Sequence, residues 1–167
     1  MKETINSIYE LYFPHIYRFL LSLCHDHYTA EDLVQETFFR AHLYVENYDG
    51  ENIKSWLFTV AHHAFIDYER KRKRTVIKEE SFFSRLFQRG KSTEDQMVVS
   101  EEIQEIIDLL QHLPEQQKLA VLLHDFNELS YQEAATVMNI TLANFKVLLF
   151  RGRQAIRKQK GVNNDDR

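Results

Sequence analysis

Three residue types that shape many small folds are scarce in this sequence of 167 residues, which has one cysteine, two prolines and four glycines. The single cysteine, Cys24, excludes an intrachain disulfide framework. Tight turns between strands usually need glycine or proline, and this sequence has few of either. Few stretches alternate apolar and polar residues, as a half-buried strand would. The sequence therefore predicts an all-α protein with little or no strand.

Long apolar runs are also missing. No stretch reads as a signal peptide, and none stays apolar for the length that a bilayer span needs. Together with the lone cysteine, this favours a protein of the reducing cytoplasm.

The chain lacks a strong net charge, because its formal value is -4. The signs are nevertheless segregated. Acids dominate residues 26–51, where Arg40 is the one basic residue, and residues 94–115, which have no lysine or arginine. Residues 146–160 have lysines and arginines but no acid. This asymmetry predicts a nucleic-acid surface on one face, and a protein partner or plain solvent on the other.

Apolar residues recur at helical spacing in the N-terminal half. Residues 4–25 predict a short helix, a bend at Pro14 and a second helix, because proline suits the first turn of a helix. Thr29 and Asp32 have capping-box spacing, which predicts a helix to about Tyr44. Its inward stripe is predicted to be Leu33, Thr37, Phe38, Ala41 and Tyr44. The acids of its first turns either complement the helix dipole or form an acidic, amide-rich docking face.

A loop over residues 47–55 precedes a predicted helix over residues 56–74, with Ser55 as its N-cap. The loop residues Tyr48, Asn52 and Lys54 either line a pocket for an unstacked base or are ordinary loop residues. The helix starts with an apolar stripe and ends in the unbroken basic run Arg70–Arg74. Alone, such a run is equally typical of a solvated helix end.

Residues 75–97 lose the helical period and are predicted to be an interdomain linker with a short amphipathic segment. Helices are then predicted over residues 98–112 and from Pro114 onward. The capping box Ser130–Glu133 opens another helix, and a turn over residues 138–140 leads to a last helix capped by Thr141.

Two helices joined by a tight turn, with the second one basic, form either a helix-turn-helix or an αα-hairpin that merely packs. The charge of the second helix favours DNA binding. Asn144, Val147, Leu148 and Arg151 are predicted to face base edges, because asparagine pairs with adenine and arginine with guanine. Lys146, Arg153 and Arg157 are predicted to hold phosphates.

Possible metal ligands gather at His15, Cys24, His25, Asp26 and His27. Their spacing matches no zinc pattern, and neighbouring side chains on a helix point apart. We therefore predict no metal site.

Three sequence motifs, in this order, resemble those of a known family. They are Ala30-Glu-Asp-Leu-Val-Gln-Glu-Thr-Phe38; Ser55-Trp-Leu…Ala61…Ala64-Phe-Ile-Asp67 with the basic run after it; and Leu129-Ser-Tyr-Gln-Glu-Ala-Ala…Met138-Asn-Ile with Asn144-Phe-Lys…Arg151-Gly-Arg153. Over nearly its whole length, the chain resembles the extracytoplasmic-function (ECF) class of the sigma-70 family of bacterial sigma factors, and within that class the sigma-M type.

The resemblance implies a role for each of the three motifs. The first would be a helix that docks on the clamp helices of the largest polymerase subunit, through Asp32, Leu33, Gln35, Glu36 and Phe38. The second would recognise the minus-10 element, through Tyr48, Asn52, Lys54, Trp56, His62, His63, Arg70, Lys71, Arg72, Lys73 and Arg74. The third would sit on the flap of the second-largest subunit and read minus-35, through Thr141, Asn144, Lys146, Val147, Leu148, Arg151, Arg153 and Arg157.

Three positions depart from the family pattern. His63 stands where asparagine is frequent, His62 where a basic residue is common, and Leu148 where many members have arginine. The histidines make DNA affinity sensitive to pH near their pKa. Leu148 shifts base reading to its neighbours, or to apolar contact with a thymine methyl.

The resemblance implies a promoter-specificity subunit that is not an enzyme, with no catalytic site and no cofactor. It would direct core RNA polymerase, trap a flipped base during promoter opening, act in the envelope stress response and be held by an anti-sigma factor, often membrane-bound. We expect a cytoplasmic monomer when free. The expected organisation is sigma region 2 over 1–74, a flexible linker over 75–97, sigma region 4 over 98–160 and a disordered tail over 161–167.

Two other functions compete with this prediction. A stand-alone helix-turn-helix regulator would bind operator DNA tightly without polymerase, normally as a dimer, but no separate dimerisation helix is evident. A metal-dependent enzyme would need paired ligand spacing, which the histidines and acids do not show.

Overall fold

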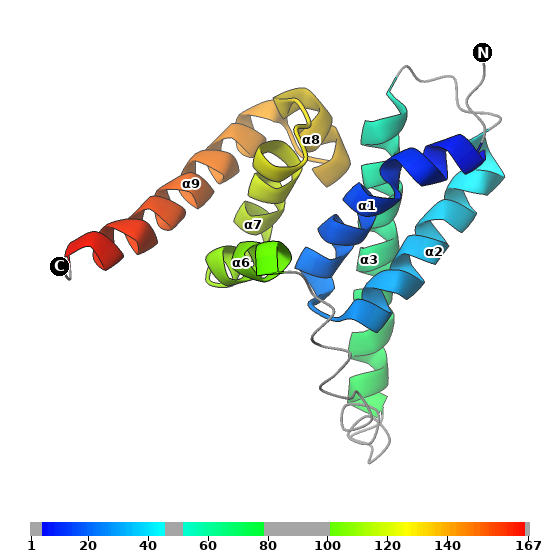
Figure 1. The fold of residues 1–167 in the computed structure, drawn as a ribbon, viewed down its shortest axis with the longest axis horizontal. Helices are drawn as coiled ribbons and strands as arrows, with labels where there is room; N and C mark the ends of the chain where they lie inside the picture. Colours follow the sequence, from blue (N-terminus) through cyan, green and yellow to red (C-terminus); the bar gives the residue numbers. More distant parts are fainter. Residues whose placement is uncertain (1–4, 46–51, 79–100, 166–167) are drawn as a thin grey trace.

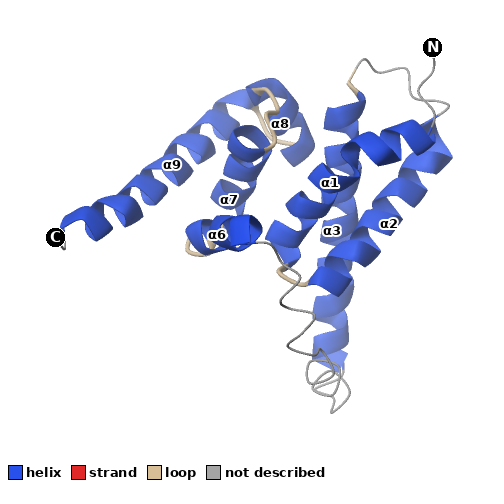
Figure 2. Ribbon diagram, viewed as in Figure 1, coloured by secondary structure: helices blue, strands red, loops and turns tan. Residues whose placement is uncertain are grey.

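The computed structural model describes residues 5–45, 52–78 and 101–165, and every regular element in those ranges is a helix (Figure 1, Figure 2). In chain order these are α1 (Ile5–Cys24), α2 (His27–Tyr44), α3 (Ile53–Lys78), α6 (Glu101–Leu110), α7 (Glu115–Val121), the π-helix η2 (Leu122–Phe126), α8 (Tyr131–Met138) and α9 (Leu142–Asp165). The all-α prediction is confirmed for this part of the chain.

Helices α1, α2 and α3 pack against one another and form the N-terminal unit (Figure 1). Its core holds fully buried aromatic and aliphatic side chains, among them Phe19 and Phe58, whose rings meet edge to face at 5.1 Å. Burying such rings removes large apolar areas from water, which supplies most of the driving force for packing the three helices.

The helix boundaries in this unit differ from the predicted ones. Pro14 lies inside a continuous α1, which changes direction along its length in Figure 1, so the predicted bend lies within one helix and does not separate two. Asp26 caps α2, because its carboxylate accepts hydrogen bonds from the Thr29 backbone at 3.0 Å and hydroxyl at 2.6 Å. The cap of α3 is Asn52, whose Oδ1 accepts from the Ser55 backbone N–H at 3.0 Å. The predicted caps Thr29 and Ser55 are therefore donors to the true caps.

Helices α6 to α9, with η2, form the C-terminal unit. The predicted capping box of α8 is confirmed: Ser130 Oγ accepts from the Glu133 backbone at 3.0 Å, and Glu133 accepts from the Ser130 backbone at 2.8 Å. Asn139 ends α8 in the left-handed conformation, with φ 56°. The turn then directs Phe145 of α9 into the core, where its side chain is fully buried. A helix-turn-helix is therefore present at the predicted place.

Two helices are longer than the sequence predicts. Helix α3 continues through residue 78, so the first residues assigned to the linker are helical, and α9 continues to residue 165, where a disordered tail was predicted. The remainder of the predicted linker, with its amphipathic segment, lies outside the described residues.

The two units also contact each other, through α3 with α8 and through α1 with α6 (Figure 1). Their buried apolar side chains belong to one continuous cluster. At a third junction, Lys118 Nζ of α7 lies 3.3 Å from His25 Nε2, just after α1. The structure is thus a closed arrangement of the two units.

Candidate polymerase-binding and nucleic-acid interfaces

The outward face of α2 carries an exposed acidic and amide-rich stripe. Asp32, Gln35 and Glu36 are all exposed. Phe39 and Leu43 continue this face by one and two further turns, with 59% and 54% of their surfaces exposed. An apolar group among acids and amides is the composition of a protein-binding surface, because such a surface needs an apolar centre and a polar rim.

Two of the five predicted polymerase contacts do not lie on this face. Leu33 and Phe38 are only 5% and 6% exposed, because they point into the core between α1, α2 and α3. Phe38 packs edge to face against Tyr9 at 4.8 Å. Their side chains support the helix from behind and offer little surface to a partner in this arrangement. A direct contact of either one with polymerase stays a prediction. The exposed aromatic is the neighbouring Phe39. Tyr44, predicted to face inward, is exposed.

An ion-pair network fixes α2 against α3. Arg40 donates from Nε to Glu36 Oε1 at 2.9 Å and from Nη2 to Asp67 Oδ2 at 3.0 Å. The hydrogen bond with Glu36, followed by that with Asp67, raises the pKa of the Arg40 guanidinium above its usual value. Beside this network, a groove of about 300 Å³ between the two helices is lined by Asp32 and Lys71 among others. The acidic stripe is therefore held at a defined angle to the basic end of α3.

The start of α3 holds three of the predicted minus-10 residues. Asn52 is exposed but is engaged as the cap, whereas Lys54 and Trp56 are half-buried, and Trp56 packs against the core. Tyr48 lies outside the described residues.

His62 and His63 have different surroundings. His63 is exposed, while His62 is turned toward α8 and lines a cavity together with Val137 and Met138. The Nδ1 atom of His62 is buried and has no hydrogen-bond partner among the described residues. Burial, followed by the neighbouring His63, lowers the pKa of His62. In this closed arrangement the predicted DNA contact of His62 is covered by protein.

The basic run at the end of α3 is exposed throughout. Arg72 is tied to Glu69 by a hydrogen bond of 3.1 Å, which raises the pKa of its guanidinium. This end of α3 extends beyond the rest of the N-terminal unit in Figure 1, which leaves its charges open to a polyanion.

The outward face of α9 presents most of the predicted minus-35 residues. Thr141 caps the helix, since its Oγ1 accepts from the Asn144 backbone at 3.1 Å. The residues that remain exposed are Asn144, Lys146, Val147, Arg151 and Arg157. Leu148 is half-buried against the core and therefore offers little to a base edge.

Arg153 is engaged within the fold. Its Nε and Nη2 donate to the two carboxylate oxygens of Asp125 in η2 at 3.1 and 2.6 Å. This bidentate pair raises the pKa of Arg153, and the nearby Tyr131 adds to the effect. Arg153 thus clamps α9 to the elements before it, and its guanidinium is engaged with Asp125 in this arrangement. Its contact with a phosphate stays a prediction.

Phe150, which the sequence-based prediction missed, is 59% exposed on the same outward face. Its exposure could have been predicted from a helical projection. Positions 145 and 149 point inward, and position 150 lies well away from both around the helix.

Among the described residues, no group of three His, Cys, Asp or Glu side chains is placed to hold a metal ion. The helices that the structure describes include none with both the length and the apolar character for crossing a membrane.

Comparisons with known proteins show the family of this chain. Residues 8–75 match the family model for Sigma-70 region 2, and residues 103–156 match that for Sigma-70, region 4. The chain is 42% identical over 165 residues to the ECF RNA polymerase sigma factor SigM of Bacillus subtilis (strain 168), covering 97% of this chain and 99% of that protein. It is 29% identical to the RNA polymerase sigma factor YlaC of the same organism, covering 94% and 92%.

Solved structures show the same fold. The sigma factor RpoE, in a co-crystal structure with the anti-sigma factor NepR from Bartonella quintana, superposes with a TM-score of 0.76 at 25% identity, covering 94% of this chain and 96% of that one. CnrH, in complex with the cytosolic domain of CnrY, superposes with a TM-score of 0.69 at 16% identity, covering 95% and 88%.

Proposed function

The chain belongs to the ECF class of the sigma-70 family, and from that premise we propose how its surfaces divide the work of transcription initiation. As a sigma factor it directs core RNA polymerase to promoters, and it is a transcription initiation factor and not an enzyme. The exposed stripe of α2 docks on core polymerase through Asp32, Gln35 and Glu36, with Phe39 and Leu43 as its apolar part. This exposed stripe is the observation that carries the proposal.

The minus-10 element is bound by α3 and the loop before it. Asn52, Lys54 and Trp56 lie at the start of the helix, near where an extruded base would be held by stacking and hydrogen bonds. His63 is on an exposed side, and the run Arg70–Arg74 neutralises phosphates of the upstream duplex.

The minus-35 element is read by the exposed face of α9. Asn144 and Arg151 hydrogen-bond with base edges, and Val147 contacts a thymine methyl group. Lys146 and Arg157 hold phosphates. The exposure of these five side chains supports this assignment of base and phosphate contacts. Arg153 is left out of it because it is already paired with Asp125.

Regulation follows the pattern of relatives whose structures contain anti-sigma factors. We propose that an anti-sigma factor holds this chain in the cytoplasm and releases it under envelope stress. We further propose region 2 over residues 1–74 and region 4 over residues 98–160 as its two functional domains.

Polymerase docking is tested by comparing Phe39→Ala with Phe38→Ala in the full chain. Phe39→Ala should change the free energy of unfolding by less than about 0.5 kcal/mol, because the side chain is exposed. It should weaken binding to core polymerase about tenfold or more, because exposed aromatics inside a docking face tend to dominate affinity. Phe38→Ala should instead cost about 3–5 kcal/mol of stability.

Pull-down and equilibrium titration with core polymerase give the affinities, and circular dichroism gives the stabilities. The docking proposal fails if Phe39→Ala binds core polymerase like the unmodified chain. Specific transcription from a promoter library by the reconstituted enzyme tests the overall function independently.

A further inference from the structure

Three histidines of the N-terminal unit lie where it meets the C-terminal unit, namely His15, His25 and His62. Each has a lowered pKa, and burial is the largest cause in every case. Burial disfavours the charged form because an imidazolium loses its hydration. The closed arrangement therefore favours neutral histidine at each of these contacts.

At the α7 junction, the geometry disfavours a charged histidine. Lys118 is only 6% exposed, and its Nζ lies 3.3 Å from His25 Nε2 across the interface. The same Nε2 lies 3.0 Å from the Ser22 carbonyl oxygen, which can only accept, so this nitrogen carries the proton of the neutral ring and donates to Ser22. A second proton on the ring places a positive charge beside the buried ammonium group. Protonation of His25 therefore weakens this junction.

Other groups near His25 act in the opposite direction but rank lower. The Ser22 carbonyl oxygen lies 3.0 Å from His25 Nε2, and Glu115 of α7 also favours the charged ring. Burial and Lys118 outweigh both, so the net shift of the pKa of His25 is downward.

At the α8 junction, His62 is enclosed without an acceptor for its buried Nδ1. A cavity of about 480 Å³ at this junction is lined by Arg40 of α2, by His63, Asp67 and Arg70 of α3, and by Val137, Met138 and Asn139 of α8. The one acid among them, Asp67, is already paired with Arg40 at 3.0 Å. The side chains that Val137, Met138 and Asn139 contribute to this lining are not titratable, so none of them compensates a proton on His62. The backbone of Val137 favours the charged ring, but burial and the neighbouring His63 outweigh it.

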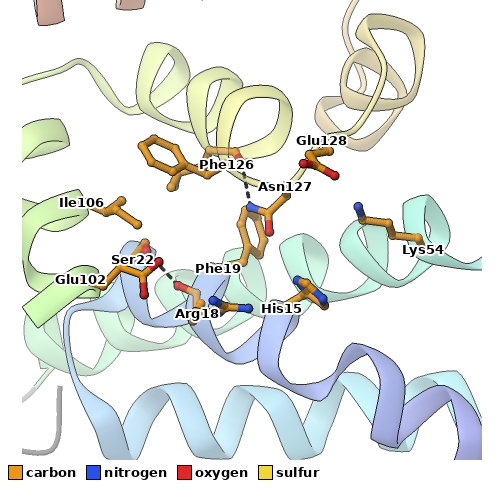
Figure 3. A pocket seen from close by; sticks show the side chains of 11 residues that line it. His15, Arg18, Phe19, Ser22, Lys54, Glu102, Ile106, Phe126, Asn127 and Glu128 are labelled. Carbon is orange, nitrogen blue, oxygen red and sulfur yellow. Dashed lines mark hydrogen bonds between the residues drawn. The ribbon is translucent and has the colours of Figure 1, made fainter. Parts of the chain in front are cut away.

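His15 lines a cavity of about 260 Å³ between the units (Figure 3). Arg18 and Lys54 of its own unit lower its pKa further, and Glu128 of the C-terminal unit raises it by less. Glu102 of α6 also lines this cavity. Because acids face His15 here, its contribution is the smallest of the three.

We propose that the contact between the two units is a pH-sensitive latch, closed while His25 and His62 are neutral and opened when they are protonated. The closed state covers His62 with α8, so opening exposes this side of α3. The latch is a property of the free chain and does not depend on which residues bind DNA.

The direction of the pH effect follows from proton linkage. Both pKa values are lower in the closed state than the ordinary value of about 6.5 expected in the open state. The open state therefore binds more protons, and closure is fully stabilised above about pH 6.5 and is lost as the pH falls below it. Between pH 7.5 and 5.5, each histidine can change the ratio of closed to open chains by at most about tenfold.

The test uses the full chain without DNA or polymerase. Its radius of gyration is measured by small-angle X-ray scattering between pH 8 and 5.5, with far-UV circular dichroism confirming that the helices persist. The unmodified chain should expand as the pH falls. The double variant His25→Gln/His62→Gln, which cannot gain these protons, should lose most of that response. His42→Gln, at an exposed site on α2, should respond like the unmodified chain.

A charge-retaining variant provides the converse measurement. His62→Lys keeps a positive charge at this position at every pH and should already be expanded at pH 8 while remaining helical. The proposal is overturned if the folded, unmodified chain keeps one radius of gyration from pH 8 to 5.5. It is also overturned if the double glutamine variant expands as much as His42→Gln.

Discussion

Helices α3 and α9 share a sequence pattern, an apolar first half followed by a basic stretch, but different parts of the chain cover them. Each packs its first half into a core and carries exposed lysines and arginines in its second half. The middle of α3 contacts α1 and α2 on one side and α8 on another, which covers His62. The outward face of α9, with Asn144, Val147 and Arg151, is exposed. In the closed chain the proposed minus-35 surface is therefore accessible, whereas the proposed minus-10 surface is partly covered.

The largest expected effect is the loss of stability when a buried aromatic side chain is removed from the core of either unit. Phe58→Ala in the N-terminal unit and Phe145→Ala in the C-terminal unit should each cost about 3–5 kcal/mol, because both rings are fully buried. Chemical denaturation followed by circular dichroism measures this loss. Since the two units share one apolar cluster, we expect a single unfolding transition above pH 7. Two separate transitions would show that the contact of α3 with α8 contributes little.

A smaller effect is expected where α9 approaches α7 most closely. A Cβ at Gly152 would lie 3.0 Å from Val121 Cγ2 and 3.3 Å from the Gln117 carbonyl oxygen, so Gly152→Ala must push the helices apart. We expect a loss of about 1–3 kcal/mol in thermal unfolding. Gly161→Ala is the control, because no atom lies within 4 Å of a Cβ there. Equal stability of the two variants would contradict the close packing of α9.

The smallest effect separates paired from free cations on α9. Arg153→Gln should cost at most about 1 kcal/mol of stability, because its pair with Asp125 is partly exposed. It should leave the salt dependence of promoter binding by the reconstituted polymerase almost unchanged. Arg157→Gln should leave stability unchanged and lower the salt slope by about one, as expected for a lost phosphate contact. The reverse assignment of the two slopes would show that Arg153 binds the phosphate.

Periodicity and capping patterns predicted most of the secondary structure, because both are local. Ser130, Glu133 and Asn139 lie within one short stretch, so their cap and turn could be predicted from spacing alone. The caps at Asp26 and Asn52 were missed because several polar residues stood at neighbouring positions, and only backbone geometry selects among them. The π-helix η2 had no recognisable pattern.

The candidate sites were predicted less completely, because a motif does not say which side of a helix is covered. Phe38 and Phe39 are neighbours of the same type, yet one is buried and the other exposed. Arg153 and Arg157 lie on the same basic helix, but the partner of Arg153 is 28 positions earlier in the chain. The contact of His62 with α8 likewise joins residues far apart in sequence.

The sequence by itself determined the helical class, the order of the two units, the helix-turn-helix and the family, since these depend on residue spacing and on motifs that are continuous in the chain. Only the tertiary structure decided which aromatic of α2 is exposed, which arginine of α9 is free and which histidines are enclosed between the units. Those properties depend on contacts between distant segments, where burial and pairing change the energy of a side chain without changing its identity.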